Sequence, residues 1–264
     1  MIVDRAAALL AEHGIETARA DAEWLVTHVL DVTRSELTAL DGDDRAVWPL
    51  VQRRANREPL AYVLGEWGFR RLALLCDERA LVPRPETEVV VERCLELLRG
   101  VERPCVLDVG TGTGAIALAL ADELDGACVT ALDSSEEALD LARDNAARTG
   151  LDIELVHGDL RAGLPPGPFD LVVSNPPYVR PDELESLEPE VRDWEPREAL
   201  VDEGQTQALA RAALDVLRPG APLVLEVHEQ RASEVGQLLE SLGYRVRISV
   251  DLTGRDRIVE GRRP

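Results

Sequence analysis

The sequence contains no lysine. All 29 basic residues are arginine, and they are outnumbered by 50 aspartates and glutamates, so the net charge is −21. A surface this acidic repels phosphate backbones, so the composition argues against nucleic acid as the substrate, although a local basic groove would still be compatible with it. The simplest interpretation of the acidity is solubility combined with genomic composition. Adaptation to salt is a second interpretation.

Aromatic residues and long apolar runs are also scarce. Aromatics make up 3% of the chain, so the core must be built mostly from leucine, valine and alanine. No apolar run reaches the roughly 18 residues that a transmembrane helix needs. The first four residues lack a basic start followed by an apolar stretch, which argues against a signal peptide. We therefore expect a cytoplasmic protein without membrane contact.

Cysteine and histidine are few and scattered. Cys76, Cys94, Cys105 and Cys128 have wide spacings that fit no metal pattern, and we expect reduced, buried thiols, with Cys105 and Cys128 in buried strands. The four histidines show no paired ligand spacing, so no metal site is expected.

The chain divides into three predicted parts. Residues 1–64 carry helical periodicity and predict a small helical bundle. Residues 65–82 combine glycine and aromatic residues with an apolar run, which is typical of a β-hairpin linker. In residues 83–264, apolar strand-like runs alternate with helical stripes, which predicts a mainly parallel sheet with helices on both faces. The fold class is therefore α/β, with a Rossmann-like domain behind a helical one.

A glycine-rich loop joins the first strand of this domain to its first helix. The loop is Gly110, Thr111, Gly112, Thr113 and Gly114. Glycine permits positive φ and lets the backbone approach a ligand closely. Open α/β sheets bind nucleotides at such loops, at the carboxyl ends of their strands. A tight turn without a ligand is the simpler alternative.

Two carboxylates follow the next strands. Asp133 ends a strand 19 residues after Gly114 and could accept both hydroxyls of a ribose, while Asp159 could lie near an adenine edge. Together with the loop, they predict an adenosine-containing cofactor. The spacing Gly-x-Gly-x-Gly differs from the Gly-x-Gly-x-x-Gly of dinucleotide sites, so it favours S-adenosylmethionine over NAD.

The tetrapeptide Asn175, Pro176, Pro177 and Tyr178 follows the strand predicted at residues 169–174. It should therefore lie at the same sheet edge as the glycine loop. An amide nitrogen is a weak nucleophile because its lone pair is delocalised. The Asn175 side-chain oxygen and a neighbouring carbonyl can each accept one N–H bond, the prolines hold these acceptors in place, and Tyr178 can pack on a planar group.

This tetrapeptide resembles the motif of amino-methyltransferases, which act on exocyclic adenine or cytosine nitrogens or on glutamine side chains. It indicates methyl transfer to an NH₂ group and leaves open the macromolecule that carries it. Alone, it could also be a proline-rich strand exit.

Further segments resemble one family, the HemK/PrmC-type protein-(glutamine) methyltransferases that modify peptide chain release factors. They are residues 57–65, 83–88, 195–200 and 251–257, and the resemblance covers nearly the whole chain. It implies a seven-stranded methyltransferase sheet with one antiparallel edge strand. It also implies S-adenosylmethionine as cofactor and a release factor as protein partner, gripped partly by the N-terminal helices. We expect a monomer that does not bind nucleic acid directly.

The resemblance implies roles for individual residues. Residues 110–114, Asp133, Asp159 and Asn175 would contact the cofactor, and Leu160 falls where the family often has an adenine-contacting residue. The catalytic and substrate-binding residues would be Asn175, Pro176, Pro177 and Tyr178, with Arg84, Pro85 and Glu86 also binding substrate.

Some of these residues have simpler interpretations. Arg84 and Glu86 could form a surface ion pair, Glu226 is expected to be a structural hydrogen-bond acceptor, and Trp194 a packing residue. The acidic run at residues 182–190 could be solvated surface or a lid over the substrate.

Three hypotheses follow for the function. The first is methylation of the glutamine in the Gly-Gly-Gln motif of release factors, with a glutamine of a ribosomal protein as the nearest alternative. A DNA adenine methyltransferase would be expected to carry a basic recognition insert, and a non-catalytic cofactor-binding module would be expected to lose Asn175 or the glycine loop. The sequence shows neither feature.

Overall fold

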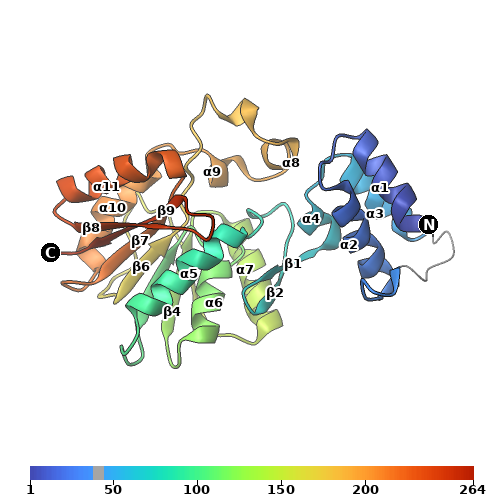
Figure 1. Ribbon diagram of the computed structural model, residues 1–264. Helices are drawn as coiled ribbons and strands as arrows, with labels where there is room; N and C mark the ends of the chain where they lie inside the picture. The colour runs from blue at the N-terminus through green and yellow to red at the C-terminus, as the bar shows by residue number, and fades with distance from the viewer. Residues whose placement is uncertain (38–44) are drawn as a thin grey trace.

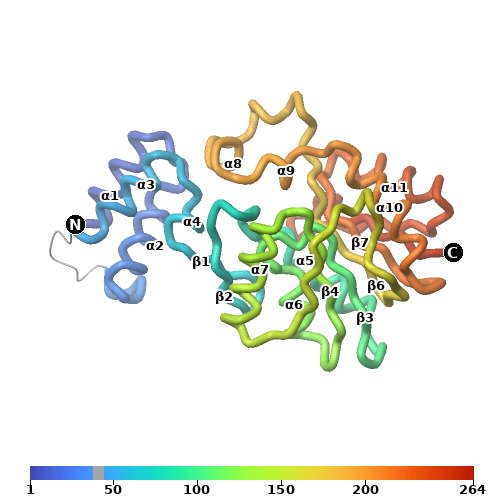
Figure 2. Tube along the Cα trace, turned by 180° about the vertical axis from the view of Figure 1, so that it is seen from behind, coloured from blue at the N-terminus to red at the C-terminus, as the bar shows by residue number. Residues whose placement is uncertain are grey.

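The computed structural model describes residues 1–37 and 45–264. A helical unit at the N-terminus lies beside a larger α/β unit, and a short hairpin runs between them (Figures 1 and 2). Within the described residues, no helix is both long and apolar enough to span a membrane.

The N-terminal unit packs its helices around a small apolar core. Val3, Ala6 and Leu10 recur at helical spacing on one helix and are buried against Leu25 and Val26 of the next. The helices are α1 (Ile2–Glu12), α2 (Ala18–Leu30), α3 (Val47–Ala55) and α4 (Leu60–Leu64). The hairpin follows at once, as β1 (Glu66–Phe69) paired antiparallel with β2 (Leu72–Leu75).

Seven strands of the described chain form one large sheet in the order β5-β4-β3-β6-β7-β9-β8. In chain order they are β3 (Cys105–Val109), β4 (Cys128–Asp133), β5 (Glu154–His157), β6 (Leu171–Ser174), β7 (Pro222–Glu226), β8 (Arg245–Val250) and β9 (Asp256–Arg262). Strands β3 to β7 run parallel, so their carboxyl ends share one edge of the sheet. The predicted α/β fold behind a helical unit is confirmed.

The resemblance implied that the antiparallel strand lies at the edge of the sheet, and this is wrong. It is β9, which pairs with both β7 and β8, and β8 is the edge strand. The physical reason is the short turn between β8 and β9, in which Asp251 Oδ1 accepts from the backbone N–H of Thr253 and of Arg255. A tight turn reverses the chain, so β9 returns antiparallel to β8. Its buried middle then pairs with β7, and the mostly exposed β8 is left at the edge.

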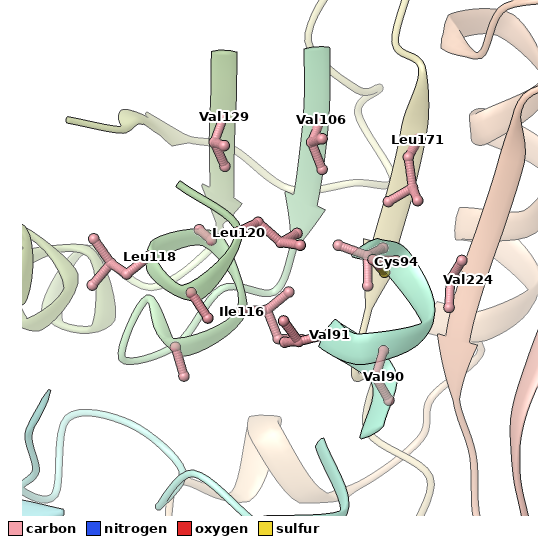
Figure 3. Packing of buried hydrophobic residues seen from close by; sticks show 14 of the residues in the cluster. Val90, Val91, Cys94, Val106, Ile116, Leu118, Leu120, Val129, Leu171 and Val224 are labelled. Carbon is pink, nitrogen blue, oxygen red and sulfur yellow. The ribbon is translucent and has the colours of Figure 1, made fainter. Parts of the chain in front are cut away.

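Helices cover both faces of the sheet, as alternation of strands and helices predicts. On one face, Val91 of α5 and Leu120 of α6 pack over Val106 and Leu171, as Figure 3 shows. On the other face, Leu209 and Leu239 belong to a second buried cluster. The helices are α5 (Pro85–Leu97), α6 (Ala115–Glu123), α7 (Glu136–Thr149), α10 (Gln205–Val216) and α11 (Ala232–Ser241).

The cysteines only partly follow the prediction. All four are free thiols, and Cys76 and Cys94 are buried, but Cys105 is half-buried and Cys128 is exposed. The reason is position: Cys105 and Cys128 are the first residues of β3 and β4, and they lie side by side at the amino end of the sheet. A strand that is buried along its length is still uncovered at its first residue.

Residues 179–201, which we call the cap segment, leave the sheet after β6 and return to it before α10. Val179 and Val201 pair in an isolated bridge that closes the base of the segment. Between them lie a 3₁₀ turn (Leu184–Ser186) and the short helices α8 (Pro189–Arg192) and α9 (Arg197–Leu200). Figures 1 and 2 both show α8 lying toward the N-terminal helices.

An ion cluster joins the cap segment to the N-terminal unit. Arg54 is buried and bonds Asp21 of α2 at 2.7 Å and Glu190 of α8 at 2.8 Å. Arg57 bonds Glu190 at 2.5 Å and also Glu188 at 3.2 Å. Burial acts to raise the pKa of Glu190, but the hydrogen bonds from Arg57 and Arg54 outweigh it and hold this pKa below its ordinary value. Part of the acidic run is therefore paired, and only part of it is solvated.

Replacing Arg54 by methionine tests this cluster. The change keeps an apolar stem but leaves Asp21 buried without its cation, so the free energy of unfolding should fall by about 3–5 kcal/mol. Urea denaturation followed by tryptophan fluorescence measures the loss. Arg143→Met removes an exposed ion pair with Asp140 and is the matched control, with an expected midpoint close to that of the wild type. Equal effects of the two changes would contradict the structural role of the buried cluster.

Candidate active site

A cavity of about 380 Å³ opens at the carboxyl ends of the parallel strands. Its walls come from the loop before α5, the glycine loop, the ends of β4 and β6, and the last part of the cap segment. Among the predicted site residues, those that line it are Arg84, Gly110, Thr111, Gly112, Thr113, Asp133, Asp159, Leu160, Asn175, Pro176 and Pro177. Most of the side chains predicted from distant parts of the sequence therefore meet around one space.

The glycine loop is tied to the end of the neighbouring strand. The N–H groups of Gly110 and Thr111 donate to the carbonyl of Leu132 at 2.8 and 3.1 Å. Gly110 and Gly112 have φ of +72° and +55°, values that favour glycine. A Cβ built on Gly110 would meet no described atom within 4 Å, so this glycine borders open space.

Gly114 has a different place from the other loop glycines. It does not line the cavity, and a Cβ there would come within 3.3 Å of Leu118 and Ala142 at a φ of +81°. Its lack of a side chain lets α6 start close to α7, which is a packing role.

Asp133 is positioned by backbone donors. Its carboxylate accepts from the N–H of Gly112 at 2.9 Å and of Ser135 at 3.0 Å, which fixes it at the mouth of the loop. Burial raises its pKa, against the lowering effect of these hydrogen bonds. Asp108, one strand away, is fully buried and accepts from Thr111 at 2.6 Å, and burial raises its pKa to about 7. Asp133 lines the cavity, whereas Asp108 lies buried beneath the glycine loop, held by Thr111.

Ser174 brings the tetrapeptide beside the glycine loop. Its hydroxyl is buried and donates to the carbonyl of Val109 at 2.6 Å, across the neighbouring strands β6 and β3. Asn175 and Gly110, the next residues of the two strands, therefore leave the sheet together. The prediction that both motifs lie at one sheet edge is confirmed by this register.

The Asn175 side chain is held by a residue that the sequence analysis did not select. Its Nδ2 donates to the hydroxyl of Thr87 at 3.3 Å, and no described donor contacts its Oδ1. Thr87 lies on α5 and also lines the cavity. The only sequence signal for it was its place inside the family-like stretch at residues 83–88.

Tyr178 lies just outside the cavity wall. Its ring is 6.1 Å from that of His228, and its backbone carbonyl accepts from Arg231 at 3.2 Å. Burial raises the pKa of its phenol. The ring belongs to an apolar cluster with Val179 and Val201, so Tyr178 also supports the base of the cap segment.

Arg84 does not form the surface ion pair with Glu86 that the sequence analysis considered. Arg84 bonds the buried carboxylate of Glu195 at 2.5 Å, so its partner is on the cap segment and the Arg84–Glu86 interpretation is wrong. Burial raises the pKa of Glu195, against the attraction of Arg84. Pro85 is exposed at the first position of α5, and Glu86 lies in the helix's first turn, where a negative charge favours the helix dipole.

Other cavity residues were missed: Pro83 and residues 196–199 were marked only by their place in the family-like stretches, and nothing in the sequence marks the rest. They come from the loop that precedes α5, from the turn after β4, and from the end of the cap segment: Arg79, Ala80, Leu81, Val82, Pro83, Ser134, Ser135, Ala138, Pro196, Arg197, Glu198 and Ala199. Trp194 packs on Tyr62, Cys76 and Val82, as expected for a packing residue.

Comparison with known proteins decides the family. The PrmC N-terminal domain matches residues 2–65, and the Methyltransferase small domain matches residues 90–216. The chain is 43% identical to a release factor glutamine methyltransferase of Deinococcus radiodurans, over 99% of this chain and 97% of that one. A release factor glutamine methyltransferase of Geobacter sulfurreducens is 39% identical over 99% of this chain and 95% of its own. The chain belongs to the release factor glutamine methyltransferase family.

A solved structure supports the fold of this family member. The ribosomal protein L11 methylase of Lactobacillus delbrueckii subsp. bulgaricus has a TM-score of 0.52 and 22% identity, covering 70% of this chain and 82% of that one. At this identity, the likeness shows the methyltransferase fold alone.

The cavity fits S-adenosylmethionine, the methyl donor that membership of this methyltransferase family implies. About 380 Å³ lies within the range of roughly 300–1,000 Å³ that is typical of ligand pockets. Ile116, Leu132 and Leu160 give the wall apolar surface, and the fixed carboxylate of Asp133 is a suitable acceptor for ribose hydroxyls.

Changing Asp133 to asparagine tests its predicted role. The variant loses one charged acceptor, so the dissociation constant of S-adenosylmethionine in isothermal titration calorimetry should rise about 10- to 100-fold. Asp170→Asn is the matched control, because Asp170 also accepts from a backbone N–H, that of Cys105 at 2.9 Å, but at the opposite end of the sheet. If both variants bound the cofactor like the wild type, Asp133 would not be a ribose acceptor.

Proposed function

We propose that this chain transfers the methyl group of S-adenosylmethionine to the side-chain amide nitrogen of the glutamine in the Gly-Gly-Gln motif of peptide chain release factors. The observation that carries the proposal is the Asn175 amide beside the cavity, with Nδ2 turned to Thr87 and Oδ1 left as an acceptor. The relatives, named as release factor glutamine methyltransferases, support the choice of substrate.

The chemistry requires control of a weak nucleophile. S-adenosylmethionine, when bound, supplies an electrophilic methyl group on a sulfonium sulfur. Asn175 Oδ1 and the Pro176 carbonyl would each accept one N–H of the substrate amide, which turns the nitrogen lone pair out of conjugation and toward the methyl group. Pro176 and Pro177 fix backbone φ, so these acceptors are ordered before the substrate arrives. The proton on nitrogen becomes acidic once the nitrogen is alkylated, so no strong base is required.

Positioning accounts for most of the catalysis in this proposal. Oriented reactants can lower a barrier by roughly 7–11 kcal/mol in favourable systems. The chain would hold the cofactor with Gly110 to Thr113, Asp133, Asp159 and Leu160, all at the cavity wall. Tyr178 would pack beside the substrate glutamine. Arg84, through its ion pair with Glu195, would hold in place the cap segment that borders the cavity.

The protein partner would be gripped outside the cavity. The N-terminal helices are joined through Arg54, Arg57 and Glu190 to the cap segment, whose last residues line the cavity, so we infer that this surface receives the partner. A release factor could rest on that surface while its glutamine enters. The net charge of −21 argues against a nucleic acid partner. We further infer a monomeric enzyme that works in the cytoplasm, where release factors act.

The substrate assignment is tested by offering the purified enzyme labelled S-adenosylmethionine with a release factor, a ribosomal protein or DNA. Label should enter the release factor and should be lost when its Gly-Gly-Gln glutamine is replaced by alanine. Label in the ribosomal protein alone, or in DNA alone, would contradict the proposal.

Replacing Asn175 by alanine separates chemistry from cofactor binding. The substrate amide loses its main acceptor, so kcat for the release factor should fall at least about 100-fold, as for removal of a preorganised transition-state hydrogen bond. Cofactor affinity, measured by calorimetry, should change far less than kcat. A variant with nearly normal turnover would show that the amide is held by other groups.

A further inference from the structure

Three side chains from separate elements form a hydrogen-bonded chain that leads away from the cavity. Asn175 follows β6, Thr87 lies on α5, and Glu226 ends β7. Asn175 Nδ2 donates to Thr87 Oγ1 at 3.3 Å, and Thr87 Oγ1 donates to Glu226 Oε2 at 2.7 Å. Thr87 is 5% exposed and Glu226 only 1%, so water does not compete for either group.

The chemistry of the three groups fixes the direction in which each hydrogen bond of this series is donated. A hydroxyl has one proton, and an ionised carboxylate can only accept. The proton of Thr87 is therefore committed to Glu226. Toward Asn175, the Thr87 oxygen can offer only lone pairs, so it selects the NH₂ end of the asparagine amide. The two ends of that amide have nearly the same shape, and this selection distinguishes them chemically.

The selected orientation matters for an amide substrate. With Nδ2 turned to Thr87, the group left for a ligand is the acceptor Oδ1. In the reversed orientation, Asn175 would present its NH₂ to the NH₂ of the substrate, and two donors would face each other. An amide flip would therefore remove the acceptor while leaving the residue, its backbone and the cavity in place.

We propose that Thr87 and Glu226 are positioning residues that hold the Asn175 amide with its oxygen available to the substrate. The inference rests on the proposed transfer to a side-chain amide and deepens it. Neither residue needs to touch the substrate amide to act, because both work through Asn175.

The charges around Glu226 make the arrangement dependent on pH. The ionisable groups that face it are Glu86 and Arg84 at the start of α5, Arg257 on β9, and Tyr178 after β6. Burial raises the pKa of Glu226 to about 7, against the lowering effects of the Thr87 hydrogen bond and of Arg257.

Above that pH, Glu226 is ionised and Thr87 must donate to it. Below it, the protonated carboxyl can donate to Thr87, and Thr87 can then donate to Asn175 Oδ1, so the selection is lost.

The first test compares two changes at Thr87. Thr87→Val keeps the shape of the side chain without the hydroxyl, whereas Thr87→Ser keeps the hydroxyl. With a release factor as substrate, Thr87→Val should lower kcat about 10- to 30-fold, and Thr87→Ser should stay within about 3-fold of the wild type. Cofactor affinity, measured by calorimetry, should change less than about 3-fold in both.

A matched control separates this effect from the loss of any buried hydroxyl. Thr130 lies on β4, away from the cavity wall. Like Thr87 it is buried, and its hydroxyl donates to a glutamate, Glu154 Oε2, at 3.0 Å. Thr130→Val should leave kcat close to that of the wild type. Equal losses in Thr87→Val and Thr87→Ser, or full turnover in Thr87→Val, would overturn the inference while leaving the proposed function in place. A wild-type enzyme that does not label a release factor would overturn the proposed function, and this inference with it.

The second test uses pH. The ionised fraction of a group with a pKa near 7 falls from about 0.9 at pH 8 to about 0.1 at pH 6, so wild-type kcat should fall over this range, by at most about 10-fold. Glu226→Gln places at this position a neutral amide that does not titrate, so its kcat, whatever its level at pH 8, should change less than about 2-fold between pH 8 and pH 6. Urea denaturation of the variant checks that it is folded. The same acidic fall in wild type and variant would contradict the role of Glu226.

Discussion

The common edge formed by the ends of the parallel strands is the constraint on which this structure depends. Strands β3, β4, β6 and β7 run in the same direction and end at one level. Ser174, which donates to the carbonyl of Val109, and the loop N–H groups that donate to the carbonyl of Leu132 fix this level at atomic detail. Because of this alignment, Asp133 and Asn175 line one cavity, and Glu226 lies behind Thr87 at the same edge, although the three are far apart in the sequence.

The parts outside the sheet add a second constraint. The cap segment is closed at its base by Val179 and Val201 and is joined at α8 to the N-terminal unit by buried charges. Arg84 and Glu195 add a further ion pair between the cap segment and the start of α5. The cap segment, which supplies part of the cavity wall, is therefore held by both the N-terminal unit and the start of α5, which suits a site that must admit one side chain of a large protein and place it accurately.

Periodic features were predictable from the sequence, and contacts between distant residues were not. The strands, the helices on both faces, the glycine loop and Asp133 follow from local patterns, and the family followed from short motifs that the comparisons then confirmed. The place of β9 between β7 and β8 did not follow, because it depends on which strand of the last hairpin pairs with β7, a contact between distant residues. The exposure of Cys128 did not follow either, because an apolar strand pattern does not show whether neighbouring elements cover the first residue of the strand.

The same division runs through the site. Glycine spacing predicted the loop, but only the packing of α6 on α7 distinguishes Gly114 from the glycines that border the cavity. Thr87 was missed because its role depends on the hydrogen bond that it donates to Glu226, 139 residues away in the sequence. Its role as a proton donor to a buried carboxylate becomes visible only when α5 and β7 are seen together.

A crystal structure of the enzyme with S-adenosylhomocysteine and a Gly-Gly-Gln peptide would test the central claim most directly. We predict that the glutamine amide nitrogen lies about 2.7–3.2 Å from Asn175 Oδ1, with Nδ2 still bonded to Thr87. A glutamine side chain bound away from Asn175, or an Asn175 amide with its oxygen turned to Thr87, would contradict the account.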